Sequence, residues 1–205
     1  MSRDSSRDIA EKWLLAEPDE DMRQELQALI DGSTEELDQR FADRLMFGTA
    51  GLRAEVGAGP LRMNRLVVRQ AAAGLVDYLL RSVEGSADAG ILIGFDARRK
   101  SDVFALDTAR VAAARGMKAM LLPNVLPTPV LAWNITRLGV AAGVMVTASH
   151  NPPQDNGYKV YLGSGAQIVP PHDTLISDAI ESFDPTLIEL APEDSPLIQV
   201  LGVEC

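Results

Sequence analysis

Short apolar segments that alternate with helical ones constrain this chain more than any other feature. Residues 90–95 (GILIGF), 118–122 (KAMLL) and 141–148 (AAGVMVTA) have the length and apolar character of buried β-strands. Segments typical of helices lie between them, at 101–116 and 128–139. Since strands that are joined through helices usually pair in parallel, the middle of the chain predicts an α/β sheet with helices on its faces.

The residues before this region predict helices. Residues 1–45 are expected to form two or three short helices that pack on the domain, and Ser33 and Glu36 have the spacing of a capping box. After a glycine-rich loop, Asn64 is expected to cap a long helix that ends near Gly85.

The residues after the third strand predict a return to the sheet. Residues 158–163 follow a loop too short for a crossover helix, so we expect this strand to be antiparallel to its neighbour. Residues 166–171 could add a short edge strand before a last helix over 173–183. The acidic, proline-interrupted tail, 184–205, is typical of a connection to something else.

We therefore predict a three-layer α/β/α sandwich with a mixed, mostly parallel sheet. We divide the chain into an N-terminal helical segment, residues 1–45, and an α/β domain, residues 46–190. Residues 191–205 are interpreted as the start of a connection to a second domain that this chain does not contain.

Composition excludes several classes of function. No apolar run approaches the roughly 20 residues of a membrane helix, and the N-terminus lacks the apolar stretch of a signal peptide, so we expect a cytoplasmic protein. The single cysteine, Cys205, suits a reducing compartment. A net charge of −10 argues against nucleic acid as a partner, although residues 46–172 hold 13 of the 19 basic side chains. This basic centre is either solvated surface or a site for a small anion.

Two loops are expected at the same edge of the sheet, because ligands of open α/β sheets bind beyond the carboxyl ends of the strands. Asp96 follows the first strand and Ser149 follows the third. The first loop also brings Arg98, Arg99 and Lys100 to a helix start, where the helix dipole already carries partial positive charge. This cluster is explained by a docked anion or, alternatively, by ordinary solvated charge.

The Ser149 loop predicts phosphoryl transfer better than acyl hydrolysis. His150 is adjacent to Ser149 and so points away from it in an extended chain, and the sequence has no G-x-S-x-G elbow. A serine hydroxyl can carry a phosphoryl group if cations neutralise the phosphate, and Arg53, Arg98 and Lys159 can supply that charge. Lys159 or His150 could assist proton transfer at the acceptor hydroxyl. The prolines 152–153 stiffen the loop, and a tight turn at 156–157 is expected to return Lys159 to Ser149.

Three motifs in this order resemble those of one enzyme family. "TASHNPPQDNGYKVY" resembles the active-site signature of the α-D-phosphohexomutase superfamily, the phosphoglucomutases and phosphomannomutases. "FGTAGLRAEVGAGPLRMN" looks like the family's N-terminal signature, and "GFDARRKSD" is similar to a further motif of its first domain. "GSGAQIVPPHD" points to the branch that includes phosphoglucomutase with phosphopentomutase activity.

The resemblance implies roles for individual residues. Ser149 would be the phosphoserine, which exchanges its group with a sugar phosphate through a bisphosphorylated intermediate. Arg53 and Lys159 would lie beside it as acid/base and charge-stabilising residues, and His150 would help to position the substrate hydroxyl. The expected substrate- and phosphate-binding residues are Thr49, Asn151, Asp96 and Arg98.

The resemblance covers only the first of the family's four domains. Mg²⁺ and a glucose 1,6-bisphosphate activator are implied for the whole enzyme, but the aspartate-rich magnesium loop belongs to the second domain. The "DEDMR" stretch, residues 19–23, is better explained by acidic residues at a helix start, so the metal site reduces to one oxygen of Ser149 or of its phosphate.

Two hypotheses about the chain follow. It is the phosphoserine domain of a phosphohexomutase that acts on phosphosugars, inactive by itself and completed by domains II–IV, or it is a stand-alone module that binds phosphate or a partner without turnover. A domain built to pack against others is also expected to self-associate through the exposed interdomain face.

Overall fold

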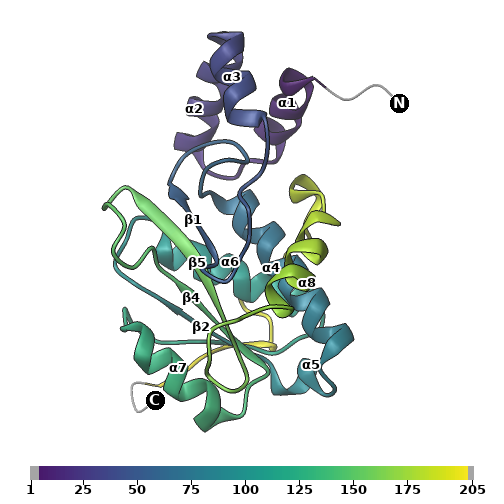
Figure 1. Cartoon of the computed structure of the whole chain (residues 1–205), viewed down its shortest axis with the longest axis vertical. Coiled ribbons are helices and arrows are strands. Elements are labelled where there is room, and N and C mark those ends of the chain that lie inside the picture. The colour runs from purple at the N-terminus through teal and green to yellow at the C-terminus, as the bar shows by residue number, and fades with distance from the viewer. Residues whose placement is uncertain (1–4, 203–205) are drawn as a thin grey trace.

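The computed structural model describes residues 5–202 and contains a mixed sheet of six strands in the order β1-β5-β4-β2-β3-β6 (Figure 1). The strands are β1 (Leu52–Glu55), β2 (Ile91–Phe95), β3 (Ala119–Leu121), β4 (Ala142–Val146), β5 (Asp155–Leu162) and β6 (Ile198–Val200). The helices are α1 (Ser6–Ala16), α2 (Glu20–Asp31), α3 (Thr34–Phe41), α4 (Arg65–Ser82), α5 (Ser86–Ala89), α6 (Ser101–Ala114), α7 (Thr128–Leu138) and α8 (His172–Glu181), with a 3₁₀ turn, η1 (Pro185–Leu187).

The pairing of the strands confirms the predicted mixed, mostly parallel sheet. β2 pairs in parallel with both β3 and β4, and β3 pairs in parallel with β6. β5 runs antiparallel to β4, as its short connection requires, and β1 runs antiparallel to β5. Helices α4, α6 and α8 pack together on one side of the sheet, and α7 packs on β2 and β4 from the other, which completes three layers (Figure 1).

The long helix α4 begins as the sequence predicts. The buried side chain of Asn64 accepts a hydrogen bond from the amide of Val67, 3.0 Å away, so it satisfies a free donor of the first turn. Its amide group donates to the carbonyl oxygens of Gly57 and Gly59 in the preceding loop. The helix ends at Ser82, and Gly85 does not close it but precedes the short helix α5.

Two local predictions were wrong. Ser33 precedes α3 but makes no capping hydrogen bond, whereas Ser5 and Asp8 form a capping box at α1. Residues 166–171 form no strand; a single bridge joins Gln167 to Tyr161. The predicted helix over 173–183 is confirmed as α8, which begins one residue earlier, at His172, and ends two residues earlier, at Glu181.

The first three helices form a layer at one end of the molecule, drawn in purple and blue at the top of Figure 1. We call α1–α3 the N-terminal helical layer. Its helices pack on one another, and the rings of Trp13 and Phe41 meet edge to face with centroids 5.9 Å apart. Their burial in the main apolar core joins this layer to the sheet domain.

The tail of the chain returns to the sheet. Residues 198–200 form β6, which pairs with β3 and extends the sheet into the segment that the sequence predicts as a connection. The domain division at residue 190 stays a prediction. Over the residues that the structure describes, no helix is both long enough and apolar enough to cross a membrane.

Candidate functional site

The chain leaves β4 at Val146 and reaches Ser149 in a left-handed turn. Ser149 is exposed and has a φ of 58°, which residues other than glycine rarely adopt. His150 is exposed next to it. The edge of the sheet at the ends of β2 and β4, which we call the rim, therefore presents the serine hydroxyl to its surroundings.

The guanidinium of Arg98 holds the loop that follows. It donates hydrogen bonds of 2.7 to 3.1 Å to four main-chain carbonyl oxygens between residues 149 and 155. These oxygens belong to Ser149, Asn151, Pro152 and Asp155. Its Nε lies 3.3 Å from a carboxylate oxygen of Asp96. Four hydrogen bonds and one ion pair thus hold the guanidinium within the protein, which favours a positioning role for Arg98 over direct phosphate binding.

Asp96 ties both rim loops together. Its carboxylate accepts hydrogen bonds from the hydroxyls of Thr147, at 2.6 Å, and Ser101, at 2.7 Å. The amide of Ser149 in turn donates to the hydroxyl oxygen of Thr147, at 3.0 Å. Ser101 is the first residue of α6, and Lys100 stands at the cap position of that helix. Asp96 therefore positions the backbone of Ser149 indirectly, through the hydroxyl group of Thr147.

The predicted tight turn at residues 156–157 is absent. Both residues lie inside β5, opposite Ala54 and Arg53 of β1. Asn156 is buried, and its amide group donates to the carbonyl oxygen of Arg99 and to the hydroxyl of Ser101, both at 2.9 Å. An Asn-Gly pair predicts a hairpin turn only when the chain must reverse there, and the reversal between β4 and β5 occurs earlier, over residues 147–154.

Arg53 and Lys159 bring two positive charges to the same face of the sheet. Lys159 lies opposite Met145, whose side chain packs in the cluster below α7, and Arg53 lies opposite Gly157, two residues before Lys159. Burial lowers the pKa of the Lys159 ammonium, and the charge of Arg53 lowers it further. Neither side chain has a carboxylate partner within the described residues, and the buried Nε of Arg53 has no hydrogen-bond acceptor.

Gly157 places Arg53 close to the serine loop. A Cβ atom there would lie 2.6 Å from the carbonyl oxygen of Leu52, 2.7 Å from that of Thr147 and 3.1 Å from Cγ of Arg53. Only glycine lets β1, β5 and the end of β4 approach this closely. Gly157 lies opposite Arg53 of β1 on one side and accepts a hydrogen bond from the amide of Thr147, just after β4, on the other. Ser149 follows two residues after Thr147.

The remaining predicted site residues lie nearby with different contacts. Asn151 is half-buried and donates a 2.8 Å hydrogen bond to the side chain of Asp155. Thr49 is exposed, and its carbonyl oxygen accepts a hydrogen bond from the side chain of Gln167. The structure thus brings Ser149, Asn151, Asp96 and Arg98 together as one bonded group. It sets Arg53 and Lys159 side by side without a direct bond to the serine.

Arg99 and Lys100 do not offer free charge to an anion, contrary to one of the two readings of the basic cluster. Arg99 pairs with Asp21 at 2.6 Å, and Lys100 pairs with Asp19 at 2.6 Å and with Asp21 at 3.0 Å. The "DEDMR" aspartates are therefore ion-pair partners of the rim. The site also contains Thr147, Ser101 and Asn156, whose contacts no sequence motif indicates, because only the fold brings their side chains to Asp96 and to the rim.

The chain does not fit a magnesium ion by itself. Magnesium prefers six oxygen ligands and usually takes carboxylates. No group of three or more histidine, cysteine, aspartate or glutamate side chains that could hold a metal occurs in residues 5–202. Ser149 can offer one oxygen, and the nearby Asp96 carboxylate is already bonded to Thr147, Ser101 and Arg98.

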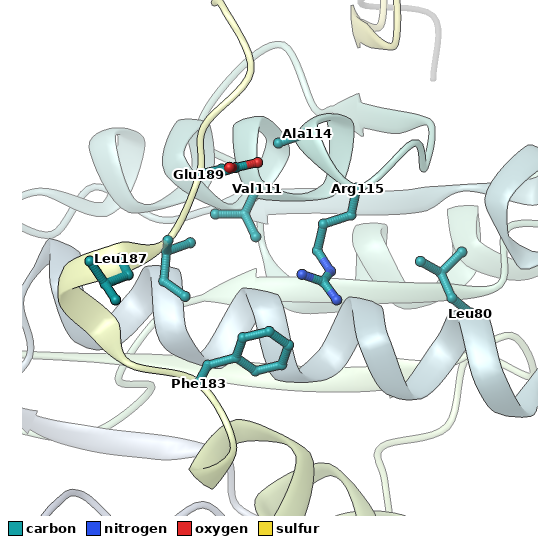
Figure 2. Close-up of a pocket in the computed structure, with 8 residues that line it drawn as sticks. Leu80, Val111, Ala114, Arg115, Phe183, Leu187 and Glu189 are labelled. Atoms are coloured by element: carbon teal, nitrogen blue, oxygen red, sulfur yellow. The ribbon is translucent and has the colours of Figure 1, made fainter.

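A cavity of about 390 Å³ lies away from the rim, between α4, α6 and the segment after α8 (Figure 2). Arg115 reaches into it from the end of α6, with its guanidinium 4.8 Å from the ring of Phe183 (Figure 2). The same guanidinium lies 3.2 Å from a carboxylate oxygen of Asp77. None of the site residues predicted from the sequence lines it. The candidate site is thus an open edge of the sheet and not this cavity.

Comparisons with known proteins match the α/β region of this chain. The family model described as "Phosphoglucomutase/phosphomannomutase, alpha/beta/alpha domain I" matches residues 44–186, which include β1 to β5 and exclude the N-terminal helical layer. A solved structure of a putative phosphomannomutase from Thermus thermophilus is similar, with a TM-score of 0.62 and 27% identity. The similarity covers 79% of this chain and 34% of that one.

Curated relatives carry mutase names. A probable phosphoribomutase of Schizosaccharomyces pombe is 44% identical over 89% of this chain, and the human phosphopentomutase is 42% identical over 80%. A probable phosphomannomutase of Haemophilus influenzae is 56% identical over 58% of the chain. The matches span 32%, 29% and 24% of these relatives, so the chain covers about a third of their length or less. With a family model matched over more than half of its residues, this chain belongs to the phosphoglucomutase/phosphomannomutase family, of which it contains the α/β/α domain I.

Proposed function

We propose that Ser149 carries a phosphoryl group for a phosphosugar mutase, which interconverts sugar 1-phosphates with 6-phosphates or 5-phosphates. The observation that supports this most directly is the pair formed by Arg53 and Lys159. Two adjacent cations without a carboxylate partner are unfavourable unless an anion joins them. They lie on the sheet face next to the strand end that presents the exposed Ser149.

The proposed step transfers one phosphoryl group between two oxygens. A sugar hydroxyl attacks the phosphorus of phosphoserine, a new P–O bond forms, and the bond from phosphorus to the Oγ of Ser149 breaks. The hydroxyl proton leaves to a base, and the serine oxygen regains a proton. The lowered pKa of Lys159 suits its amine to exchange a proton with the hydroxyl, and Arg53 would stabilise the charge on the phosphoryl oxygens.

Other parts of the proposal come from the family. The names of the relatives point to pentose and hexose phosphates as substrates, and another relative is named glucose 1,6-bisphosphate synthase. Glucose 1,6-bisphosphate is therefore our proposed activator, and Mg²⁺ our proposed metal. Because this chain lacks a fitting ligand set, the remaining metal ligands are assigned to other domains of a complete enzyme. His150, Thr49 and Asn151 stay predictions as substrate-binding residues, and a cytoplasmic location stays a prediction as well.

The alternative of a stand-alone phosphate- or partner-binding module makes a different prediction about turnover. We expect the 205-residue chain to show no interconversion of glucose 1- and 6-phosphate, since it covers about a third of its relatives. Exposed apolar side chains, such as Leu15 and Leu187 with 90% and 76% of their surface accessible, support an interdomain partner or self-association.

Phosphorylation at Ser149 tests the proposal. Intact mass and peptide mapping are measured for the protein as purified from cells and after incubation with glucose 1,6-bisphosphate and Mg²⁺, in parallel with Ser149→Ala. We expect the added mass of one phosphoryl group at Ser149 and none in the variant. Absence of the modification from both preparations, or its presence at another residue, contradicts the proposed role. A serine-dependent mutase rate of the chain alone contradicts the predicted inactivity only.

A further inference from the structure

Lys100 and Ser149 share an unusual backbone conformation. Within the described residues, they are the two non-glycine residues with positive φ, at 64° and 58°. For an L-residue with a Cβ atom this conformation costs roughly 1–2 kcal/mol. Such conformations persist when surrounding contacts hold them, and they are concentrated at functional sites. The contacts that hold Lys100 are therefore of interest for the site.

The N-terminal helical layer supplies those contacts. Asp19 and Asp21 stand at the start of α2 and receive the ammonium of Lys100 and the guanidinium of Arg99. Asp19 is itself held by Arg65 of α4, 3.1 Å away. The side chains of Lys100 and Asp19 are only 14% and 15% exposed, so water screens this ion pair less than it screens surface pairs.

The turn at Lys100 is continuous with the residue that holds the serine loop. Arg98 lies two residues earlier and donates to the four carbonyl oxygens of the loop. The carbonyl oxygen of Arg99 accepts a hydrogen bond from Asn156 of β5, which orients the same turn from the other side. The direction in which Arg98 extends therefore depends on the backbone at residues 98–100.

We propose that Asp19 and Asp21 are positioning residues for Ser149: they hold the turn at Lys100 in its left-handed conformation and thereby direct Arg98 to the serine loop. The helical layer that lies N-terminal to the family domain thus sets the geometry of that domain's site. The inference deepens the proposed function, since Ser149 is the proposed phosphoryl carrier. It is tested on the loop itself, without sugar phosphate.

Hydrogen exchange of the loop amides provides the test. The amides of Asn151 and Asp155 donate to the carbonyl oxygens of Ala148 and Pro152, so their protection reports the order of the loop. In the double variant Asp19→Asn/Asp21→Asn we expect exchange at these amides to be faster by about fivefold or more. The amide of Leu175, at the start of α8, should be unchanged. Glu181→Gln, which removes the ion pair with Arg44, is the matched control and should leave the loop unchanged.

A glycine substitution separates positioning from general loss of stability. Glycine adopts positive φ without strain, so adding Lys100→Gly to the double variant should restore protection of the loop, whereas adding Lys100→Ala should not. In the otherwise unchanged chain, Lys100→Gly should preserve the loop although it deletes two ion pairs, and Lys100→Ala should loosen it. This second comparison tests whether the left-handed turn at Lys100 positions the serine loop even if the double variant does not fold.

Two outcomes overturn the proposal: loop protection that is unchanged in the folded double variant, or equal effects of Lys100→Gly and Lys100→Ala in the otherwise unchanged chain. Neither outcome bears on whether Ser149 becomes phosphorylated. Conversely, a chain that is never phosphorylated at Ser149 can still show the predicted exchange pattern. Failure of this inference and failure of the proposed function are therefore distinguishable.

Discussion

The guanidinium of Arg98 donates a 3.1 Å hydrogen bond to the main-chain carbonyl oxygen of Ser149, 51 residues later in the chain. The side chain of Arg98 is 17% exposed and donates hydrogen bonds to four main-chain carbonyl groups of the serine loop. A planar fork with five donors can reach all of them and Asp96 at once, which a single ammonium group cannot do. The conformation of the serine loop thus depends on a residue of the neighbouring strand–helix connection.

Replacement of Arg98 should therefore destabilise the loop and the protein. We expect Arg98→Ala to lower the free energy of unfolding by about 1–3 kcal/mol, because four main-chain carbonyl groups and the Asp96 carboxylate lose a charged donor. Arg98→Lys should recover less than half of that loss. Urea unfolding measures both. Arg137→Ala, which removes an exposed cation–π contact with Trp133, is the control and should change little. Full recovery by lysine would contradict the fork geometry.

Ser149 should respond differently to glycine and to alanine. Both variants lose the hydroxyl and should not become phosphorylated, but only glycine is unstrained at a φ of 58°. We expect Ser149→Gly to be more stable than Ser149→Ala by about 1 kcal/mol. Thermal or urea unfolding of the two proteins measures the difference. Equal stabilities would indicate that the serine does not hold a left-handed conformation in solution.

The lowered pKa of Lys159 predicts a pH dependence. Between the folded-state pKa and the ordinary value of 10.5, the unfolded chain binds more protons at this residue than the folded chain. The contribution of Lys159 to the free energy of unfolding should therefore rise with pH as the folded-state amine loses its proton. Lys159→Met should flatten this rise, which urea unfolding at about pH 8 and about pH 10 can measure. Lys118→Met, on the surface, serves as the comparison.

Arg53 supplies a second check on Lys159. Removal of the guanidinium in Arg53→Met should raise the pKa of the lysine, because one of the two causes of its depression is lost. NMR titration of the Lys159 side chain would measure this change. A pKa that does not rise in Arg53→Met would show that the two charges are not close in solution.

Glu17 predicts a pH dependence of the opposite kind. Only 3% of this side chain is exposed, and burial raises its pKa to about 7 from an ordinary value of 4.5. The folded state therefore binds a proton that the unfolded state releases, so stability is fully present below pH 4.5 and falls as the pH rises to about 7. The hydrogen bond from the amide of Asp19 and the charges of Arg69 and Lys100 lower the pKa of Glu17, and the charge of Asp19 raises it, but burial has the largest effect.

Substitution of Glu17 by its neutral counterpart tests this directly. Glu17→Gln should be more stable than the unchanged protein by about 1–3 kcal/mol near pH 8, with little difference near pH 4.5. Glu11→Gln, at an exposed position of α1, should show no comparable gain. Urea unfolding across this pH range is the measurement. A difference that does not depend on pH would contradict the buried, protonated carboxyl group.

Local patterns predicted much of the fold. The buried strands at 91–95 and 142–146 and the Asn64 cap depend on short-range periodicity and capping, which a single sequence displays. The turn assigned to residues 156–157 was wrong, because the same Asn-Gly pair is compatible with a buried strand when neighbouring strands require close approach. The strand at 198–200 was missed, because three residues carry too little pattern for prediction.

The residue types that gather at the rim were predictable, but their contacts were not. A serine, cations and a carboxylate at strand ends favour phosphoryl transfer, which stays a proposal. The partners of Arg99 and Lys100 were not predictable, since Asp21 and Asp19 lie 78 and 81 residues away. Whether a surface cation is free or paired depends on tertiary contacts, and only the structure separates Arg53 and Lys159 from the paired group.

The strand order has a consequence for the order of events during synthesis. All groups that define the rim, from Asp19 to Lys159, precede residue 160, whereas β6 occupies residues 198–200 and covers the outer edge of β3. As the ribosome releases the chain from its N-terminus, the serine loop and its partners emerge while β3 still has an unpaired edge. A nascent chain at this stage exposes backbone groups of β3 on which another strand could pair.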